Sequence, residues 1–319
     1  MKFTPLGDLW HKVPAPPNCF INPGILPTGS LLAIVGEPGQ GKSFLAQQTA
    51  FELACGKRWV GLFSTKEAKV GYLELEKQTP ITQLRIHRED WKKLYPKAGE
   101  NLGYFDSGKL YLDTQRDTQI LGTMITDMGC NVVVIDSFNV TVANENDPEN
   151  MKIALNNYRW LTKTIGVAFV MVVQLRKRGH AYDHKASKFV EPPLSLDDLR
   201  GSKLFEYEID SAVGITRTGA GATRNFAFLK HSHSPVEYMS KTPLSLQYNA
   251  ATAPPFKTRA SDVIEILEKN DNQLSYTEIE KALDIERPTL KKLINKLSEY
   301  EVVYSYEGGG GSKGYVYLV

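Results

Sequence analysis

The chain has 319 residues, enough for about two domains, and 42% of them are hydrophobic and 23% charged, which excludes a disordered or collagen-like protein. The formal net charge is +2, too balanced to indicate nucleic acid by itself, and three widely spaced cysteines exclude a disulfide framework. The mean hydropathy is −0.30 and neither a membrane span nor a secretory signal is evident, so we expect a cytoplasmic protein that does not contact a membrane.

The sequence divides into four segments. Residues 1–30 are rich in Pro and Gly and are expected to be an entry segment that lies against the core. Residues 31–250 alternate short apolar runs with helical stretches, which predicts an α/β domain with a mostly parallel sheet between helices. Residues 251–259 contain two adjacent prolines and are predicted to be a linker to a small domain over 260–319. The predicted strands of the larger domain are 31–35, 70–75, 132–135, 167–173, 212–216 and 226–229, and its predicted helices include 42–55, 80–94 and 148–164.

A glycine-rich motif follows the first predicted strand. Residues 36–43, Gly-Glu-Pro-Gly-Gln-Gly-Lys-Ser, match G-x-x-x-x-G-K-[ST], and a helix comes next. Glycines let backbone N–H groups turn toward phosphate, and the positive end of the helix points at the same place. We expect Lys42 to reach the β- and γ-phosphates of ATP and Ser43 to ligate Mg²⁺. The residues expected to hold the nucleotide are Gly36, Gly39, Gln40, Gly41, Lys42, Ser43 and Phe44.

Polar residues end three later strands. Asp136 follows an apolar run and is predicted to hold Mg²⁺, with a turn or cap as the alternative. Glu74 and Glu76 lie two apart, on one face of a strand. Glu76 is nearer the carboxyl edge of the sheet, where ligands bind, so we predict that it polarises the attacking water. Glu74 is then an edge charge or a salt-bridge partner. Gln174 is predicted to sense the γ-phosphate, with capping as its alternative.

A basic segment begins directly after Gln174. Residues 176–189 contain five Lys/Arg and one Asp, with aromatic residues among them and no apolar periodicity. We predict a mobile loop that binds single-stranded DNA, because cations contact the phosphates and aromatic rings stack on bases. A solvated basic loop is the alternative. The residues predicted to contact DNA are Arg176, Lys177, Arg178, Lys185 and Lys188.

The last 60 residues predict three helices, at 260–270, 275–283 and 287–300, followed by two strands at 302–306 and 315–319. This is the order of a winged helix-turn-helix. The segment carries seven Lys/Arg and eleven Asp/Glu, a net charge of 7 − 11 = −4, which is poor for a reader of duplex DNA. The third helix nevertheless carries Arg287, Lys291 and Lys292 where a recognition helix would carry them. Contact with duplex DNA and contact with protein, including ring assembly, both remain open.

Together these motifs resemble the RecA-fold ATPases, most closely the hexameric replicative helicases of the plasmid RepA and DnaB types. The resemblance covers roughly residues 20–250 and rests on residues 24–30, 36–43, 54–59, 71–76, 172–175, 198–202 and 209–212. It implies ATP hydrolysis at the interfaces of a ring, usually of six subunits, with the basic loop at the central channel. Lys230 matches a basic finger that acts on the γ-phosphate of the neighbouring subunit. The replicative branch of the family often has an Arg two residues later, where this chain has Ser232. Either Lys230 acts alone, or Arg217, Arg224, His231 or His233 substitutes for that arginine, or hydrolysis is slow.

We therefore expect an ATP- and Mg²⁺-dependent helicase or translocase on single-stranded DNA that replicates a plasmid, phage or other mobile element. One alternative is a RecA-like recombination or mediator ATPase that coats DNA as a filament. Another is a nucleotide-switched DNA-binding regulator. A metabolic kinase would leave the basic loop and the last 60 residues unexplained.

Overall fold

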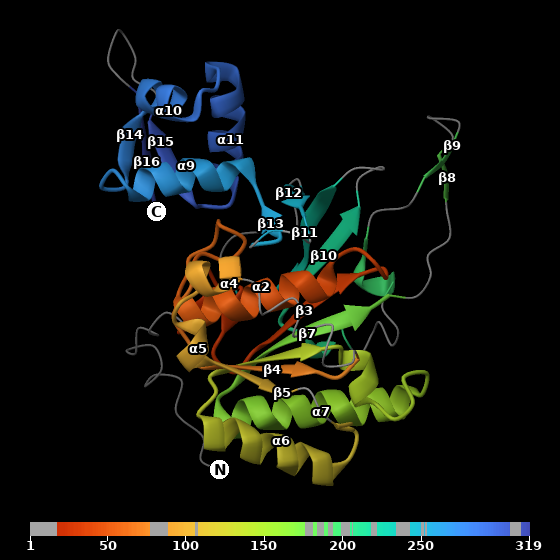
Figure 1. Cartoon of the computed structure of the whole chain (residues 1–319). Coiled ribbons are helices and arrows are strands. Elements are labelled where there is room, and N and C mark those ends of the chain that lie inside the picture. The colour runs from red at the N-terminus through yellow and green to blue at the C-terminus, as the bar shows by residue number, and fades with distance from the viewer. Residues whose placement is uncertain are drawn as a thin grey trace, which may run out of the picture.

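The computed structural model describes residues 18–76, 89–105, 108–175, 181–183, 188–190, 194–198, 205, 207–217, 222–233, 243–249, 252, 254–306 and 314–319. Within these ranges a nine-stranded sheet lies between helices, and a smaller carboxyl-terminal unit follows it (Figure 1). The predicted α/β class, with a RecA-like core, is confirmed.

The large sheet has the strand order β13-β12-β11-β10-β3-β7-β6-β4-β5. The strands from β10 to β5 run parallel, whereas β11, β12 and β13 are antiparallel to their neighbours. The prediction of a parallel strand over 226–229 is therefore wrong, because these residues belong to β11, which pairs antiparallel with β10. The strands are β3 (Leu31–Gly36), β4 (Val70–Glu74), β5 (Leu102–Phe105), β6 (Val132–Asp136), β7 (Ala168–Gln174), β10 (Ser211–Arg217), β11 (Thr223–His231), β12 (Leu244–Tyr248) and β13 (Phe256–Lys257).

Helices cover both faces of this sheet (Figure 1). One face packs against α2 (Lys42–Cys55), α4 (Glu89–Leu94) and α5 (Ala98–Asn101). The other packs against α6 (Gln115–Met128) and α7 (Pro148–Ile165). The central strands are buried along their whole length, as continuous apolar runs predict. Of the predicted helix over 80–94, the first part lies outside the described residues. Shorter elements are β1 (Cys19–Ile21), β2 (Leu26–Pro27), η1 (Phe138–Thr141), β8 (Ala181–Asp183), β9 (Lys188–Val190) and η2 (Leu196–Asp198).

Parallel pairing brings the ends of four strands to one edge of the sheet. Gly36 at the end of β3 is level with Gln174 at the end of β7. Glu74 at the end of β4 is level with Asp136 at the end of β6. Side chains that are up to 138 positions apart in the chain (174 − 36 = 138) are thus placed along a single edge.

The carboxyl-terminal unit contains the three helices and the last two strands that the sequence predicts, and an additional strand, β14, between the first and second helices. A three-stranded sheet of order β14-β16-β15 packs on three helices whose apolar residues form the core, among them Ile279, Ile294 and Leu297. Ser275 caps the second helix and forms a capping box with Glu278, as its spacing predicts. The elements are α9 (Arg259–Glu268), β14 (Gln273–Ser275), α10 (Tyr276–Leu283), α11 (Arg287–Glu299), β15 (Val303–Tyr306) and β16 (Tyr315–Leu318).

This unit is packed against the larger domain beside β12 and β13 (Figure 1). The rings of Phe63 and Tyr300 lie 6.0 Å apart, and Arg58 forms an ion pair with Glu268 at 2.6 Å. The segment predicted to be a linker contains β13, whose Phe256 is fully buried. The connection therefore belongs partly to the sheet. Within the described ranges, none of the helices has the length and apolar character needed to cross a membrane.

Candidate functional site

The glycine-rich loop curls around the amino group of Lys42, the first residue of α2. Lys42 Nζ donates hydrogen bonds to the carbonyl oxygens of Gly36 at 2.8 Å and Glu37 at 2.9 Å. Gly41 has φ 100°, and a Cβ at this position would come within 2.9 Å of the Phe256 ring, so only glycine fits. A Cβ at Gly39 would meet nothing within 4 Å, so the loop is open on that side. The loop has the shape and donors of a phosphate cradle.

Two oxygen ligands lie next to this cradle. Ser43 Oγ donates to Asp136 Oδ1 at 3.2 Å, which joins the start of α2 to the end of β6. Asp136 is 1% exposed, and its Oδ2 accepts a hydrogen bond from the Tyr72 hydroxyl at 2.9 Å. Mg²⁺ prefers oxygen ligands and usually takes only one or two from protein, completing its shell with substrate phosphates and water. Ser43 and Asp136 fit that pattern.

Glu76 and Gln174, which the sequence predicts to act in hydrolysis, contact each other. Gln174 Nε2 donates to Glu76 Oε1 at 3.1 Å. The backbone N–H of Gln174 donates to Asn139 Oδ1 at 2.9 Å, and Asn139 Nδ2 in turn donates to Glu145 at 2.8 Å. Glu76 is exposed, so its carboxylate is accessible to water. This arrangement links the predicted base to the predicted sensor.

Glu74, which the sequence leaves open as an edge charge or a salt-bridge partner, is buried at the carboxyl end of β4. It is 2% exposed and lies opposite Asp136, because β4 is an inner strand between β5 and β6. Burial and the neighbouring carboxylates of Asp136 and Glu74 raise the pKa of Tyr72 well above its usual value. The Tyr72 hydroxyl therefore stays protonated and remains a hydrogen-bond donor.

Lys230 lies away from the cradle of its own chain. It pairs with Ala212 on β10, which in turn pairs with Ala33 on β3, three residues before Gly36. Because β11 is antiparallel to these strands, its first residues lie level with the loop and Lys230 lies toward the opposite edge. The register therefore does not place Lys230 level with the phosphate loop of its own chain.

The sequence does not predict the group of side chains that surround the loop, among them Arg224, which it offers only as an alternative basic finger. Arg224 Nε donates to the carbonyl oxygen of Gln40 at 3.1 Å, and the guanidinium lies 4.7 Å from the centre of the Tyr248 ring. Burial, followed by the charge of Arg217, lowers the pKa of Arg224. Tyr248 also contacts the rings of Phe44 and Phe256. The alternating burial of β12 indicates a strand, but nothing in the sequence places that strand beside the loop.

The residues predicted to contact nucleic acid are only partly described. Arg176, Lys177, Arg178 and Lys185 lie outside the described residues, and Lys188 is described only as backbone, in β9. Its strand pairs with β8, so the segment predicted to be a loop contains an antiparallel strand pair. On α11, Lys291 and Lys292 are exposed. Arg287 forms an ion pair with Glu280 at 3.0 Å and lies over the Tyr276 ring.

A phosphate cradle at the end of β3, with Asp136 at the end of a neighbouring strand, defines a P-loop ATPase domain of the RecA-like fold. The chain belongs to the AAA domain family, whose sequence pattern matches residues 2–180, more than half of its length. It is similar to the DNA helicase/primase of Enterobacteria phage T3, with 24% identity over 220 residues. That match covers 63% of this chain but 38% of the phage protein, so the chain spans about two fifths of the relative's length.

The fold is also that of a solved KaiC-like protein from the archaeon Pyrococcus horikoshii OT3. The two structures align with a TM-score of 0.50 and 13% sequence identity, over 75% of this chain and 92% of the other. At this identity the likeness shows the fold alone. It accounts for the large sheet and its helices.

Proposed function

We propose that this protein is an ATP- and Mg²⁺-dependent helicase or translocase that acts on single-stranded DNA, in the replication of a plasmid, phage or other mobile element. The observation that supports the ATPase activity is the convergence of four strand ends and one helix start at a single edge of the sheet. The similarity to a phage DNA helicase/primase supports the choice of DNA as the substrate.

In the proposed cycle each side chain at this edge has a role, which the contacts of the loop support. Lys42 exchanges its two loop carbonyls for the β- and γ-phosphate oxygens of ATP. Mg²⁺, held by Ser43 and Asp136, would neutralise charge on the same phosphates. Glu76 orients a water molecule in line with the γ-phosphate and accepts its proton. The aromatic face of Tyr248, beside the loop, offers a surface for the base of the nucleotide.

In this proposal Gln174 couples ATP hydrolysis to the binding of DNA. Its side chain contacts Glu76, and Asn139 fixes its backbone. Loss of the γ-phosphate changes the contacts of Gln174 and Glu76. This change alters the conformation of the basic segment that follows Gln174 in the sequence. Arg176, Lys177, Arg178, Lys185 and Lys188 then bind or release the phosphates of a single strand.

The subunits assemble into a ring, most simply a hexamer. The position of Lys230 at the edge away from its own cradle supports this, because a neighbouring subunit can bring that lysine to the γ-phosphate. Trans-acting cations of this kind contribute about 10³–10⁵ in rate. Closed rings in electron micrographs would support this assembly, whereas open filaments on DNA would favour the recombination or mediator ATPase instead.

The test is displacement of a strand from a forked duplex in the presence of ATP and Mg²⁺, with K42A as the control. We expect unwinding by the wild type and none by K42A. Hydrolysis without unwinding by the wild type would contradict the helicase assignment and leave the ATPase assignment intact. Absence of both nucleotide binding and hydrolysis would contradict both.

A second candidate function is a nucleotide-switched regulator that binds duplex DNA through a winged helix. The observation that favours it is that β13 contacts the phosphate loop and leads directly into α9, while α11 exposes Lys291 and Lys292. Slow hydrolysis combined with ATP-dependent, sequence-specific binding of duplex DNA in a mobility-shift assay would favour this function over the helicase.

A further inference from the structure

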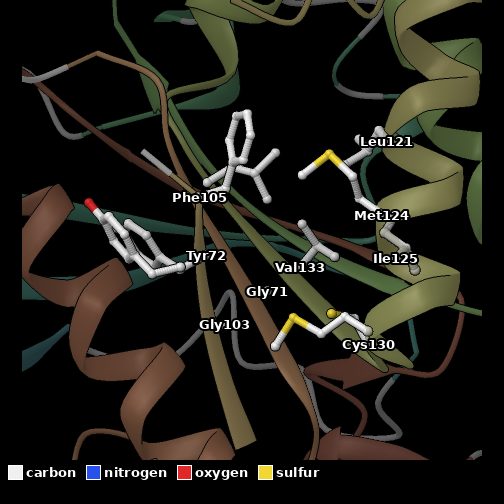
Figure 2. Close-up of a pocket in the computed structure, with 12 residues that line it drawn as sticks. Gly71, Tyr72, Gly103, Phe105, Leu121, Met124, Ile125, Cys130 and Val133 are labelled. Atoms are coloured by element: carbon white, nitrogen blue, oxygen red, sulfur yellow. The ribbon is translucent and has the colours of Figure 1, made fainter. Parts of the chain in front are cut away.

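Tyr72 lies in the middle of β4 on the face of the sheet that packs against α2. It is level with Val134 on β6 and with Tyr104 on β5. Figure 2 shows its ring pointing away from an apolar cavity of about 140 Å³ on the other face, which Met124, Ile125 and Val133 help to line. The hydroxyl of Tyr72 therefore faces the side of the sheet that carries the phosphate loop.

The two oxygens of Asp136 accept hydrogen bonds from different directions. Oδ2 accepts from the Tyr72 hydroxyl at 2.9 Å, and Oδ1 accepts from Ser43 at 3.2 Å. Tyr72 and Asp136 are 2% and 1% exposed, so water has little access to this hydrogen bond. The contact with Tyr72 leaves Oδ1 facing Ser43, on the side where a metal ion would lie.

The Tyr72 hydroxyl is held in position by the packing of its ring. Its ring stacks on that of Tyr104, with 5.5 Å between centroids and 9° between planes. A donor held in this way restricts rotation of the Asp136 carboxylate about its last side-chain bond.

We propose that Tyr72 is a positioning residue for Mg²⁺, which it orders indirectly by holding Asp136 Oδ1 toward Ser43. This rests on the proposed ATPase function and specifies how its metal site is preorganised. Groups that orient a metal ligand typically change metal affinity by about 10–100-fold when they are removed. Tyr72 is separate from Glu76, which lies four residues later in the chain and acts on water, so its loss should affect the metal requirement and leave proton transfer intact.

The experiment compares Y72F with Y104F in the full chain. Both variants lose a buried hydroxyl from the same stacked pair, but only the hydroxyl of Tyr72 contacts Asp136. Binding of a fluorescent ATP analogue is measured against free Mg²⁺ concentration and again in EDTA. We expect Y72F to need about tenfold more Mg²⁺ for half-maximal binding. We also expect its affinity in EDTA and its hydrolysis rate at saturating Mg²⁺ to stay within about twofold of the wild type, and Y104F to match the wild type throughout.

A wild-type Mg²⁺ requirement in Y72F would overturn the proposal, as would an equal increase in Y104F, which would indicate a packing effect. Binding in EDTA reports that each variant is folded. If Y72F fails that check, Y72L, which also removes the hydroxyl, takes its place in the same titration with Y104L as its control, and the same two outcomes decide. A wild-type protein that binds no nucleotide at all would instead contradict the proposed ATPase function.

Discussion

The charged side chains of the site are each held by named partners in a poorly hydrated setting. The ammonium of Lys42 is bound by two loop carbonyls, and the carboxylate of Asp136 by the hydroxyls of Tyr72 and Ser43. A buried charge is tolerated only when it is hydrogen-bonded. These contacts hold the groups in place before substrate arrives. Exposed Glu76 differs from them, because a base needs access to water.

Replacing Glu76 by Gln tests its role as the base. E76Q keeps the shape of the side chain and its reach to Gln174 but cannot accept a proton from water. We expect the rate of ATP hydrolysis to fall by about 10²–10³, with nucleotide affinity within a few-fold of the wild type. Steady-state hydrolysis and nucleotide binding are the measurements, and E149Q, at an exposed position on α7, is the control. Near-normal hydrolysis by E76Q would exclude Glu76 as the base.

The sequence predicts those site residues that lie in contiguous signals. The loop motif identifies Lys42 and Ser43, and apolar runs that end in a polar residue identify Asp136 and Gln174. Tyr72 and Tyr248 were missed, and Arg224 was predicted only as an alternative basic finger, because their places beside the loop depend on the order of the strands. Tyr72 nonetheless shares the two-residue spacing of Glu74 and Glu76, and that spacing places Tyr72 and Glu74 on one face of β4, with Glu76 two residues past its end.

At the level of elements, α2 is bound to β13 through a buried glutamine. Gln48 Nε2 donates to the Phe256 carbonyl at 3.1 Å, and the Phe256 N–H donates to Gln48 Oε1 at 2.9 Å. Two prolines at 254 and 255 predicted an exposed connection, but these hydrogen bonds and the apolar ring of Phe256 bring the segment into the sheet. The helix that begins at the phosphate loop is thereby attached to the strand that leads into the carboxyl-terminal unit.

Two neighbouring glutamines on α2 provide a matched test of this attachment. Gln48 is 0% exposed and makes both hydrogen bonds, whereas Gln47 is 3% exposed and its Nε2 lacks a hydrogen-bond partner within the described part of the chain. We expect Q48L to lower the free energy of unfolding by about 2–4 kcal/mol, because buried backbone groups of Phe256 lose their partners. Q47L should change it by less than about 1 kcal/mol in either direction. Urea denaturation of both variants is the measurement, and equal losses would contradict the assignment.

Glu52, one turn further along α2, makes stability depend on pH. Burial raises its pKa to about 8, although hydrogen bonds from Gln48 and the Val60 N–H act in the opposite direction. The unfolded chain loses this proton near the ordinary value of 4.5, so the stability that Glu52 contributes is present below that pH and is lost as pH rises toward 8.

The measurement is the free energy of unfolding of the wild type minus that of E52Q, taken at several pH values, since contributions from other groups cancel in the difference. We expect this difference to fall by on the order of 2 kcal/mol between pH 5 and 8. A difference that stays constant, or that grows with pH, would show that the pKa of Glu52 is not raised.

At the scale of the whole molecule, one chain does not bring Lys230 to its own phosphate loop. The register of β11, β10 and β3 places Lys230 toward the opposite edge of the sheet. Neither the strand order nor this direction follows from the sequence, because a short apolar strand can pair on either side and in either sense. The resemblance to the RecA-fold ATPases predicted that Lys230 acts on the γ-phosphate of a neighbouring subunit, and the register of β11 is consistent with that role.

Mixing two inactive variants tests action in trans. K42A lacks a working cradle but supplies Lys230, and K230A has the complementary defect. In a randomly mixed ring, about one quarter of the sites combine an intact cradle with a neighbouring Lys230, so the mixture should regain about a quarter of the wild-type rate. Steady-state hydrolysis after mixing and reassembly is the measurement. A mixture no more active than its components would contradict the trans assignment.

The proposal of a DNA-stimulated ATPase is tested most directly by the rate of ATP hydrolysis with Mg²⁺. This rate is measured for the wild type and K42A, with and without single-stranded DNA. The account predicts hydrolysis by the wild type that single-stranded DNA stimulates severalfold, and none above background by K42A. A wild-type rate that equals the K42A rate, with or without DNA, would contradict it.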